Sequence, residues 1–309
     1  MISSMLITAL TPIFAMIALG FAIARTPIAG PGAWELIERL TYYLFFPALL
    51  VLRLSDSRFR GEQLQDIVLV LLIAVGVLSI LLVGLRKFIA ADASTFSSVF
   101  QGSIRFNTYI GLAIIESLYG DAGLTRAALC LVVFIPLVNF LSVISLTAGS
   151  GELGRRLVIV VGSVLTNPLV LACGVGLALS YSNFALPELA EAVVGILSQP
   201  ALPLGLLAVG AGIRFVAIGE QSWPLIVALI AKLGALPSLV LLVCVVFQIN
   251  NQLAQVLLIF AALPSPPSAY ILARQLNGNV TLMANIITLQ TLAVFFMLPL
   301  WLQLSQRFL

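Results

Sequence analysis

Two short polar interruptions of apolar sequence hold the residues best suited to chemistry. One runs from Gly102 to Gly111 and contains Arg105 and Asn107; the other reads Leu-Pro-Ser-Pro-Pro-Ser over residues 263–268. Three prolines in four residues remove three backbone N–H donors, so a helix cannot pass unbroken through 263–268. An offset of 156 residues, which also aligns other parts of the chain, carries 263–264 onto 107–108. We therefore expect two broken helices whose breaks cross near the middle of a membrane.

Three charged residues fall inside or near apolar runs, where a charge costs about 2.5–3.5 kcal/mol at a helix centre. Arg105 could present a two-pronged guanidinium to a carboxylate, or it could be an interfacial or ion-paired arginine. Lys232 is ten residues into the run 223–247, too deep to reach either surface, so it either pairs with a carboxylate or binds an anion. Glu116 is close to the end of its run, which favours an interfacial position.

The sequence has no aspartate or glutamate close to Asn107 or Pro264, although sodium- or proton-coupled carriers of this kind commonly use one or two buried carboxylates there. This argues for an anionic substrate, held by cationic and polar side chains and by half-helix N-termini. Coupling to H⁺ or Na⁺ stays open, because carbonyl and amide groups alone could bind a driving ion. The candidate substrate-binding residues are Asn107, Arg105, Thr108, Tyr109, Pro264, Ser265, Pro266, Ser268 and Lys232, with helix breaks at Asn107, Pro264, Pro266 and Pro267. Asn139, Asn167, Gln199, Asn285 and Gln290 are expected to form interhelical hydrogen bonds instead.

The composition places most of the chain in lipid. Of 309 residues, 61% are hydrophobic and 9% charged, and the mean hydropathy is +1.17. The absence of histidine removes histidine catalysis and histidine metal sites, and three isolated cysteines in apolar runs predict no metal cluster. We expect no cofactor, no enzyme activity and no nucleic-acid partner. An intramembrane enzyme is the less favoured alternative to a carrier, and a passive channel with unsaturated flux remains open.

Hydropathy predicts an all-helical protein with ten membrane spans. They lie near 4–24, 36–54, 66–88, 94–119, 124–148, 157–180, 189–216, 223–247, 251–274 and 280–305. Eight Lys and Arg residues follow the odd-numbered spans, Arg155 and Arg156 among them, and five lie on the opposite side, including Arg58 and Arg60. The excess of positive charge on cytoplasmic loops then predicts both termini on the non-cytoplasmic side.

The offset of 156 residues also aligns prolines and a glycine of the first half with the same residue types in the second. It pairs Pro12 with Pro168, Gly20 with Gly176 and Pro47 with Pro203. We expect a first five-helix repeat at 1–148, a short cytoplasmic linker at 149–156 and a second repeat at 157–309. Because each repeat has an odd number of helices, the second must be inverted, as in secondary transporters.

The chain resembles the auxin efflux carrier family, which includes bacterial relatives of the plant PIN-FORMED and PIN-likes transporters. The motifs that carry the resemblance are Phe45-Phe46-Pro47-Ala48-Leu49, Arg105 to Gly111, Thr166-Asn167-Pro168-Leu169, Gln199-Pro200 to Gly210, and Ala261 to Tyr270. The resemblance spans the whole length and implies Asn107, Pro264 and Pro266 as functional positions.

The resemblance also implies an architecture like that of sodium/proton antiporters and bile-acid symporters. Helices 1, 2, 6 and 7 would form a scaffold that dimerises through helices 2 and 7, and helices 3–5 and 8–10 a transport domain that moves like an elevator. The implied cargo is an auxin-like acid or a malate- or malonate-type carboxylate, and the implied location of a bacterial member is the inner membrane.

Overall fold

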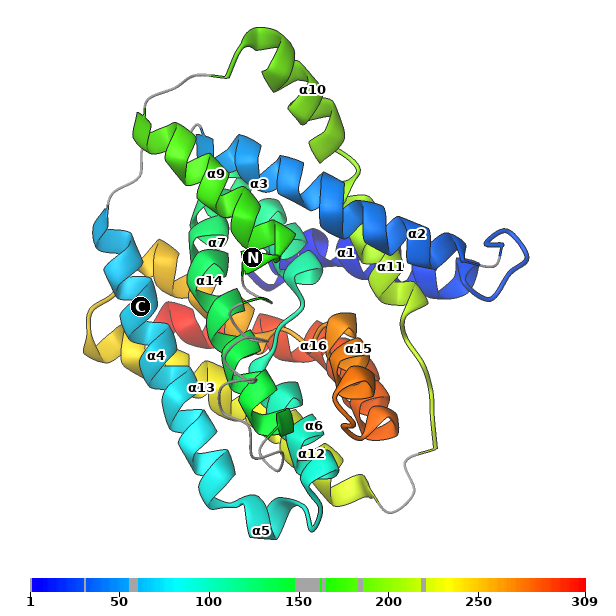
Figure 1. Ribbon diagram of the computed structural model, residues 1–309. Helices are drawn as coiled ribbons and strands as arrows, with labels where there is room; N and C mark the ends of the chain where they lie inside the picture. The colour runs from blue at the N-terminus through cyan, green and yellow to red at the C-terminus, as the bar shows by residue number, and fades with distance from the viewer. Residues whose placement is uncertain are drawn as a thin grey trace. The chain divides into compact units, whose positions relative to one another are not determined.

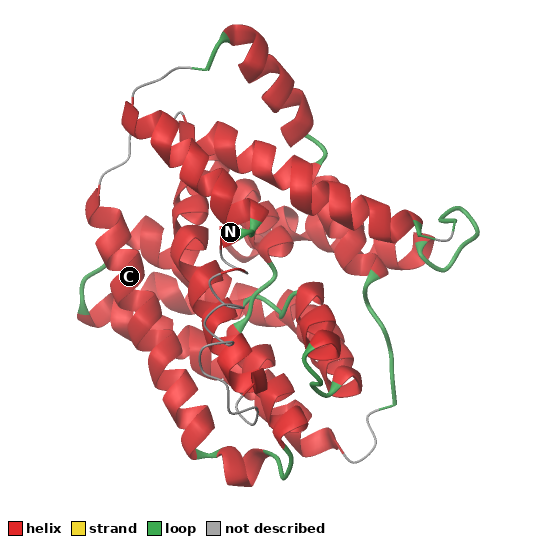
Figure 2. Cartoon of the chain, in the orientation of Figure 1, coloured by secondary structure: helices red, strands yellow, loops and turns green. Residues whose placement is uncertain are grey.

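The computed structural model describes residues 2–30, 32–55, 61–147, 162, 165–182, 186–217 and 221–309. Every regular element in these ranges is helical, and none of the described residues forms a strand (Figure 2). The predicted linker at 149–156 lies outside the described residues. So do Arg58, Arg60, Arg155 and Arg156, on which the prediction of orientation partly depends.

The described chain divides into two compact units, and the first comprises Met1–Gln65, Tyr109–Ile135 and Val164–Gly212. Its elements are α1 (Ile2–Ile23), α2 (Ala33–Leu40), the π-helical segment η1 (Thr41–Phe45), α3 (Phe46–Ser55), the first part of α7 (Thr108–Thr147), α9 (Pro168–Ser182), α10 (Glu188–Ser198) and α11 (Ala201–Ala211). Within this unit α1 packs along α11, and α3 packs along α9 (Figure 1).

The second unit comprises Asp66–Thr108, Pro136–Ser163 and Ile213–Leu309. It contains most of α4 (Gly61–Gly84), α5 (Arg86–Ile89), α6 (Ala93–Ile104), the last part of α7, α12 (Ser222–Ile230), the π-helical segment η3 (Ala231–Ala235), α13 (Leu236–Val246), α14 (Asn251–Ala262), α15 (Pro267–Gln275) and α16 (Val280–Phe308).

Two glycines allow the close helix packing of the first unit. A Cβ atom on Gly20 would collide with the Leu207 carbonyl oxygen, and a Cβ atom on Gly176 would lie 3.2 Å from the Val51 carbonyl oxygen and 2.7 Å from Leu54 Cβ. Glycine removes this steric barrier and lets two helix backbones approach. The two contacts are equivalent under the sequence offset, because adding 156 to Gly20 and to Val51 gives Gly176 and Leu207.

Each π-helical segment ends two residues before a proline, Pro47 after η1 and Pro237 after η3. A proline ring clashes with the carbonyl four residues earlier and offers it no N–H, so a locally wider turn relieves the clash. For Pro237 that carbonyl belongs to Leu233, and it accepts a hydrogen bond of 2.7 Å from Trp301 Nε1 of α16. The proline therefore explains the widened turn, and Trp301 satisfies the freed carbonyl.

Five helical stretches of the described residues are long and apolar enough to cross a membrane, and α14 with α15, bent by 51°, makes up to six. One stretch, Ala93–Leu146, covers the predicted spans 94–119 and 124–148. Its backbone leaves the helical region at Arg105–Asn107 and again at Gly120, whose φ of 58° and ψ of −151° separate the two spans. The total of ten spans stays a prediction.

Candidate functional site

The two predicted helix breaks lie side by side in the second unit. α6 ends at Ile104 before α7 begins at Thr108, and α14 ends at Ala262 before α15 begins at Pro267. The backbone N–H of Asn107 in the first break donates a 2.8 Å hydrogen bond to the carbonyl of Pro264 in the second. Asn107 is completely buried and Pro264 is buried. A backbone hydrogen bond thus joins the two breaks directly.

The residues that end α6 and α14 have nearly the same conformation. Arg105 has φ −75° and ψ 158°, and Leu263 has φ −73° and ψ 155°. At Leu263 the prolines impose this extended backbone, because a residue before proline is disfavoured in the helical region. The first break contains no proline; besides the Asn107–Pro264 bond, the ring of Phe106 packs edge-on against Phe260 at 5.1 Å. Proline signals therefore locate only one of the two breaks.

Gln290 of α16 bonds to backbone groups at both breaks and in α12. Its Oε1 accepts from the Ser265 N–H at 2.8 Å, and its Nε2 donates to the carbonyls of Gly102 at 2.8 Å and Ala228 at 3.3 Å. The Ser265 hydroxyl donates to the same Gly102 carbonyl at 2.9 Å. Both side chains are completely buried. Ser265, a predicted substrate ligand, is thus engaged in holding the crossing together.

Arg105 reaches from the first break to the start of the second half-helix. Its Nη2 donates to Ser268 Oγ at 3.1 Å, and Ser268 is the second residue of α15, whose N-cap Pro266 provides no side-chain cap. Arg105 is 8% exposed, whereas Ser268 is exposed. A cation beside a helix N-terminus meets the positive end of the helix dipole, so the arrangement favours a negatively charged ligand.

The structure does not gather all the predicted ligands in one place. Thr108, the first residue of α7, is half-buried beside Asn107. Tyr109 belongs to the first unit, where its ring stacks on Phe46 at 4.6 Å. Lys232 lies on η3 in the second unit, completely buried, and its Nζ has no hydrogen-bond partner among the described residues.

A cavity of about 610 Å³ in the first unit contains Arg53, Glu116 and Gln199. Arg53 also forms an ion pair of 2.9 Å with Asp121. Glu116, for which the sequence predicts a position at the membrane interface, is half-buried and lines this cavity.

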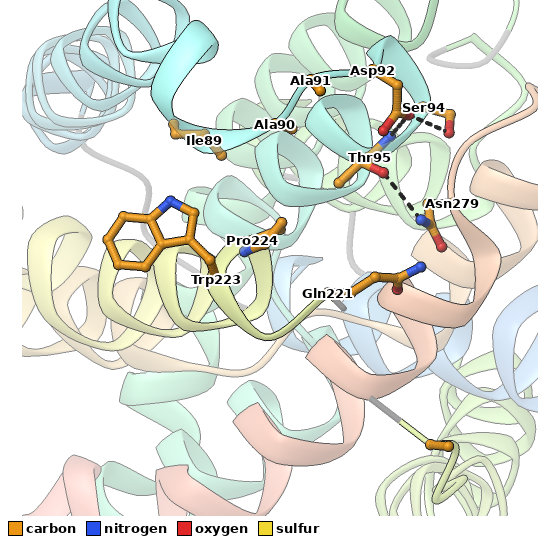
Figure 3. A pocket seen from close by; sticks show the side chains of 11 residues that line it. Ile89, Ala90, Ala91, Asp92, Ser94, Thr95, Gln221, Trp223, Pro224 and Asn279 are labelled. Atoms are coloured by element: carbon orange, nitrogen blue, oxygen red, sulfur yellow. Dashed lines mark hydrogen bonds between the residues drawn. The ribbon is translucent and has the colours of Figure 1, made fainter. Parts of the chain in front are cut away.

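A second cavity, of about 830 Å³, lies in the second unit where α6, α12 and α16 begin (Figure 3). Asp92 caps α6 by accepting from the Thr95 N–H at 2.8 Å, and Asn279 donates to Thr95 Oγ1 at 3.1 Å, so these side chains fix the helix starts. The lining of neither cavity includes Asn107 or Pro264. Within the described ranges, no group of three His, Cys, Asp or Glu side chains could hold a metal ion.

Comparison with known protein families identifies the family of this chain. A family model described as "membrane transport protein" matches residues 5–149 and 155–302, which is nearly the whole chain. A search of curated proteins gave no match. The match and the apolar helices together define an integral, multi-pass membrane protein of a transporter family rather than an enzyme family. The chain therefore belongs to the auxin efflux carrier family of membrane transport proteins.

Proposed function

We propose that this transporter is a carrier for a small organic anion, a mono- or dicarboxylate or an auxin-like acid. The observation that carries the proposal is the pairing of buried Arg105 with Ser268 at the first turn of α15. Guanidinium and helix dipole are both positive there, and a carboxylate would relieve their repulsion while accepting hydrogen bonds. Asn107 and Thr108 would add polar contacts at the start of α7, where the second half-helix dipole also favours negative charge.

Pro264 and Pro266 would serve the site through the backbone. Their rings prevent α14 and α15 from joining into one helix, which keeps the N-terminus of α15 at the crossing. Ser265 would support the site rather than bind cargo. Its N–H donates to Gln290, and its hydroxyl and the Gln290 amide both donate to the Gly102 carbonyl. Tyr109 would act within its own unit, where it stacks on Phe46.

The proposal includes the finer architecture expected from the repeat. Ten spans in two inverted five-helix repeats are supported by the equivalent contacts of Gly20 with Leu207 and of Gly176 with Val51. The matching dihedral angles of Arg105 and Leu263 support the same symmetry. From the family resemblance we also propose elevator-type movement of helices 3–5 and 8–10 against a scaffold of helices 1, 2, 6 and 7. A dimer through helices 2 and 7, a bacterial inner-membrane location and non-cytoplasmic termini belong to the same proposal.

A thermal-shift screen of mono- and dicarboxylates on the purified protein tests the anion site. A ligand that binds only the folded state raises the melting temperature, by about 2 °C or more when it is well above its dissociation constant. We expect at least one carboxylate to do so for the wild type and for Arg25→Gln, which removes the same charge from an exposed position in the first unit. Arg105→Gln should lose at least tenfold in apparent affinity, since a charge-assisted hydrogen bond contributes about 1.5–3 kcal/mol.

If Arg105→Gln bound the carboxylate as tightly as Arg25→Gln does, Arg105 would not be part of the cargo site. If uncharged analogues stabilised the wild type as well as the carboxylates do, the anionic character of the cargo would be refuted.

A further inference from the structure

Lys232 is a buried amine for which the crossing supplies no carboxylate partner. It lies in the middle of the helical stretch Ser222–Val246, its side chain has no exposed surface, and its Nζ has no hydrogen-bond partner within the described part of the chain. Burying an ammonium group without compensation costs several kcal/mol. An ammonium group that stays charged there requires a source of negative potential next to it.

The described helices that make the main contacts with this segment carry no acidic side chain. η3 contacts α6, α12, α13, α14 and α16, whose sequences contain no aspartate or glutamate and only one charged residue, Arg307 near the end of α16. Asp66 of α4 acts electrostatically on Cys244, which is twelve residues beyond Lys232 and therefore roughly 18 Å along the helix. On these helices, the groups that could compensate an ammonium carry no full charge.

The C-terminal ends of two half-helices provide such groups. The last carbonyls of a helix have no helical partner and carry about half a negative charge together. α6 and α14 both end at the crossing, and both pack against η3. Each end therefore favours a cation, just as the starts of α7 and α15 favour an anion.

The contacts of Gln290 place Lys232 beside these ends. The Gln290 amide joins the Gly102 carbonyl near the end of α6, the Ser265 N–H just after α14, and the Ala228 carbonyl, one helical turn before Lys232. Side chains on a helix lean toward its N-terminus, so the lysine stem runs back toward Ala228.

A second buried polar side chain lies near the end of α6. Gln101, the residue before Gly102, is completely buried, and neither its Oε1 nor its Nε2 has a hydrogen-bond partner among the described residues. Its amide oxygen is a suitable acceptor for a cation. The carbonyl of Leu233, by contrast, is already bonded to Trp301.

We propose that Lys232 is a tethered cation that compensates the C-terminal ends of α6 and α14. In cation-coupled carriers with broken helices, such ends bind Na⁺ or H⁺. Here the ammonium group takes that place permanently, with Gln101 as its neighbour, so folding and cargo binding require no Na⁺. The inference rests on the proposed carrier function and deepens it: the crossing has an anion end at Arg105 and Ser268 and a cation end at Lys232.

Chemical rescue of Lys232→Ala tests the proposal. The substitution removes three carbons and the ammonium group, which together match n-propylammonium. We expect the purified full-length variant to melt below the wild type, and n-propylammonium chloride to raise its melting temperature by about 2 °C or more over equal choline chloride. n-Propanol, which fills the same volume without charge, should not do so, and Lys232→Met, which fills the space itself, should gain nothing from n-propylammonium.

Two results would overturn the proposal. One is a Lys232→Ala melting temperature that n-propanol raises as much as n-propylammonium does, because volume rather than charge would then be the missing element. The other is measured on the wild type and does not require the variant to fold: a melting temperature several degrees higher in NaCl than in choline chloride would reveal a Na⁺ site that the lysine does not fill. Neither readout needs a cargo, so a failed carboxylate screen and a failed rescue remain distinguishable.

Discussion

At the scale of single residues, Gln290 links the two breaks through its side-chain amide. Replacing it with leucine leaves the Ser265 N–H and one lone pair of the Gly102 carbonyl without these partners in a buried place. An unsatisfied buried polar group costs about 1–3 kcal/mol, so we expect Gln290→Leu to lower the free energy of unfolding by at least that amount. Unfolding in detergent, followed by circular dichroism, measures the loss.

Gln306→Leu is the matched control, because Gln306 is exposed near the end of the same helix. It should change the free energy of unfolding by less than about 0.5 kcal/mol. Equal losses in the two variants would show that the Gln290 contacts do not stabilise the crossing.

The sequence could predict only some of these residue roles. Prolines mark the break at 264–267 because they lack N–H donors, and the repeat offset leads from there to Asn107. Gln290 was expected to form an interhelical hydrogen bond, but not to join both breaks, since its three partners come from three distant segments. The Arg105–Ser268 bond likewise depends on how two breaks pack, which spacing along the chain does not encode.

At the scale of helices, two glycines on α9 provide a direct comparison. A Cβ atom on Gly176 would press on Leu54 and Val51, whereas one on Gly174 would meet nothing within 4 Å. We expect Gly176→Ala to destabilise the protein by about 1–3 kcal/mol through overpacking. Gly174→Ala should be neutral or stabilise by up to about 1 kcal/mol, because alanine favours helix. Thermal unfolding of both variants decides; similar melting temperatures would contradict the close packing of α3 and α9.

The start of α6 predicts a dependence of stability on pH. The Thr95 N–H donates to the Asp92 carboxylate and is the main reason that the pKa of Asp92 lies below its ordinary value of 3.8; burial opposes this shift, and the Ser94 hydroxyl adds a smaller lowering. A lowered folded-state pKa means that the carboxylate stabilises α6 above about pH 4, and that this contribution disappears as the pH falls through the lowered pKa.

We therefore expect the stability advantage of the wild type over Asp92→Ala, about 1 kcal/mol for an N-cap, to shrink below pH 4. Melting temperatures of the two proteins between pH 3 and pH 7 measure it. A difference that stays constant over this range would refute the role of the ionised carboxylate.

Helix positions follow from hydropathy more closely than their interruptions do. Predicted spans such as 223–247 and 280–305 match long apolar helices at Ser222–Val246 and Val280–Phe308. The π-helical turns before Pro47 and Pro237 were not predicted, although each proline explains its turn. A proline can kink, end or widen a helix, and which of these occurs depends on partners such as Trp301.

At the scale of the whole molecule, composition and the family match establish a multi-pass membrane transport protein. Composition indicates the membrane location, because so apolar a surface suits lipid rather than water, and the family match supplies the transport class. The cargo and the movement of the helices cannot be predicted in the same way. They depend on small free-energy differences between conformations, which composition does not reveal.

Counterflow in proteoliposomes most directly tests a carrier with a closed site at the crossing of the broken helices. Vesicles that contain the purified protein are loaded with the carboxylate found in the thermal-shift screen, and uptake of the labelled compound is measured from outside. Such a carrier should show saturable uptake that the internal carboxylate accelerates, and Asn107→Ala should lose both properties. Uptake that rises linearly with concentration, follows voltage and ignores the internal carboxylate would contradict it and indicate a channel.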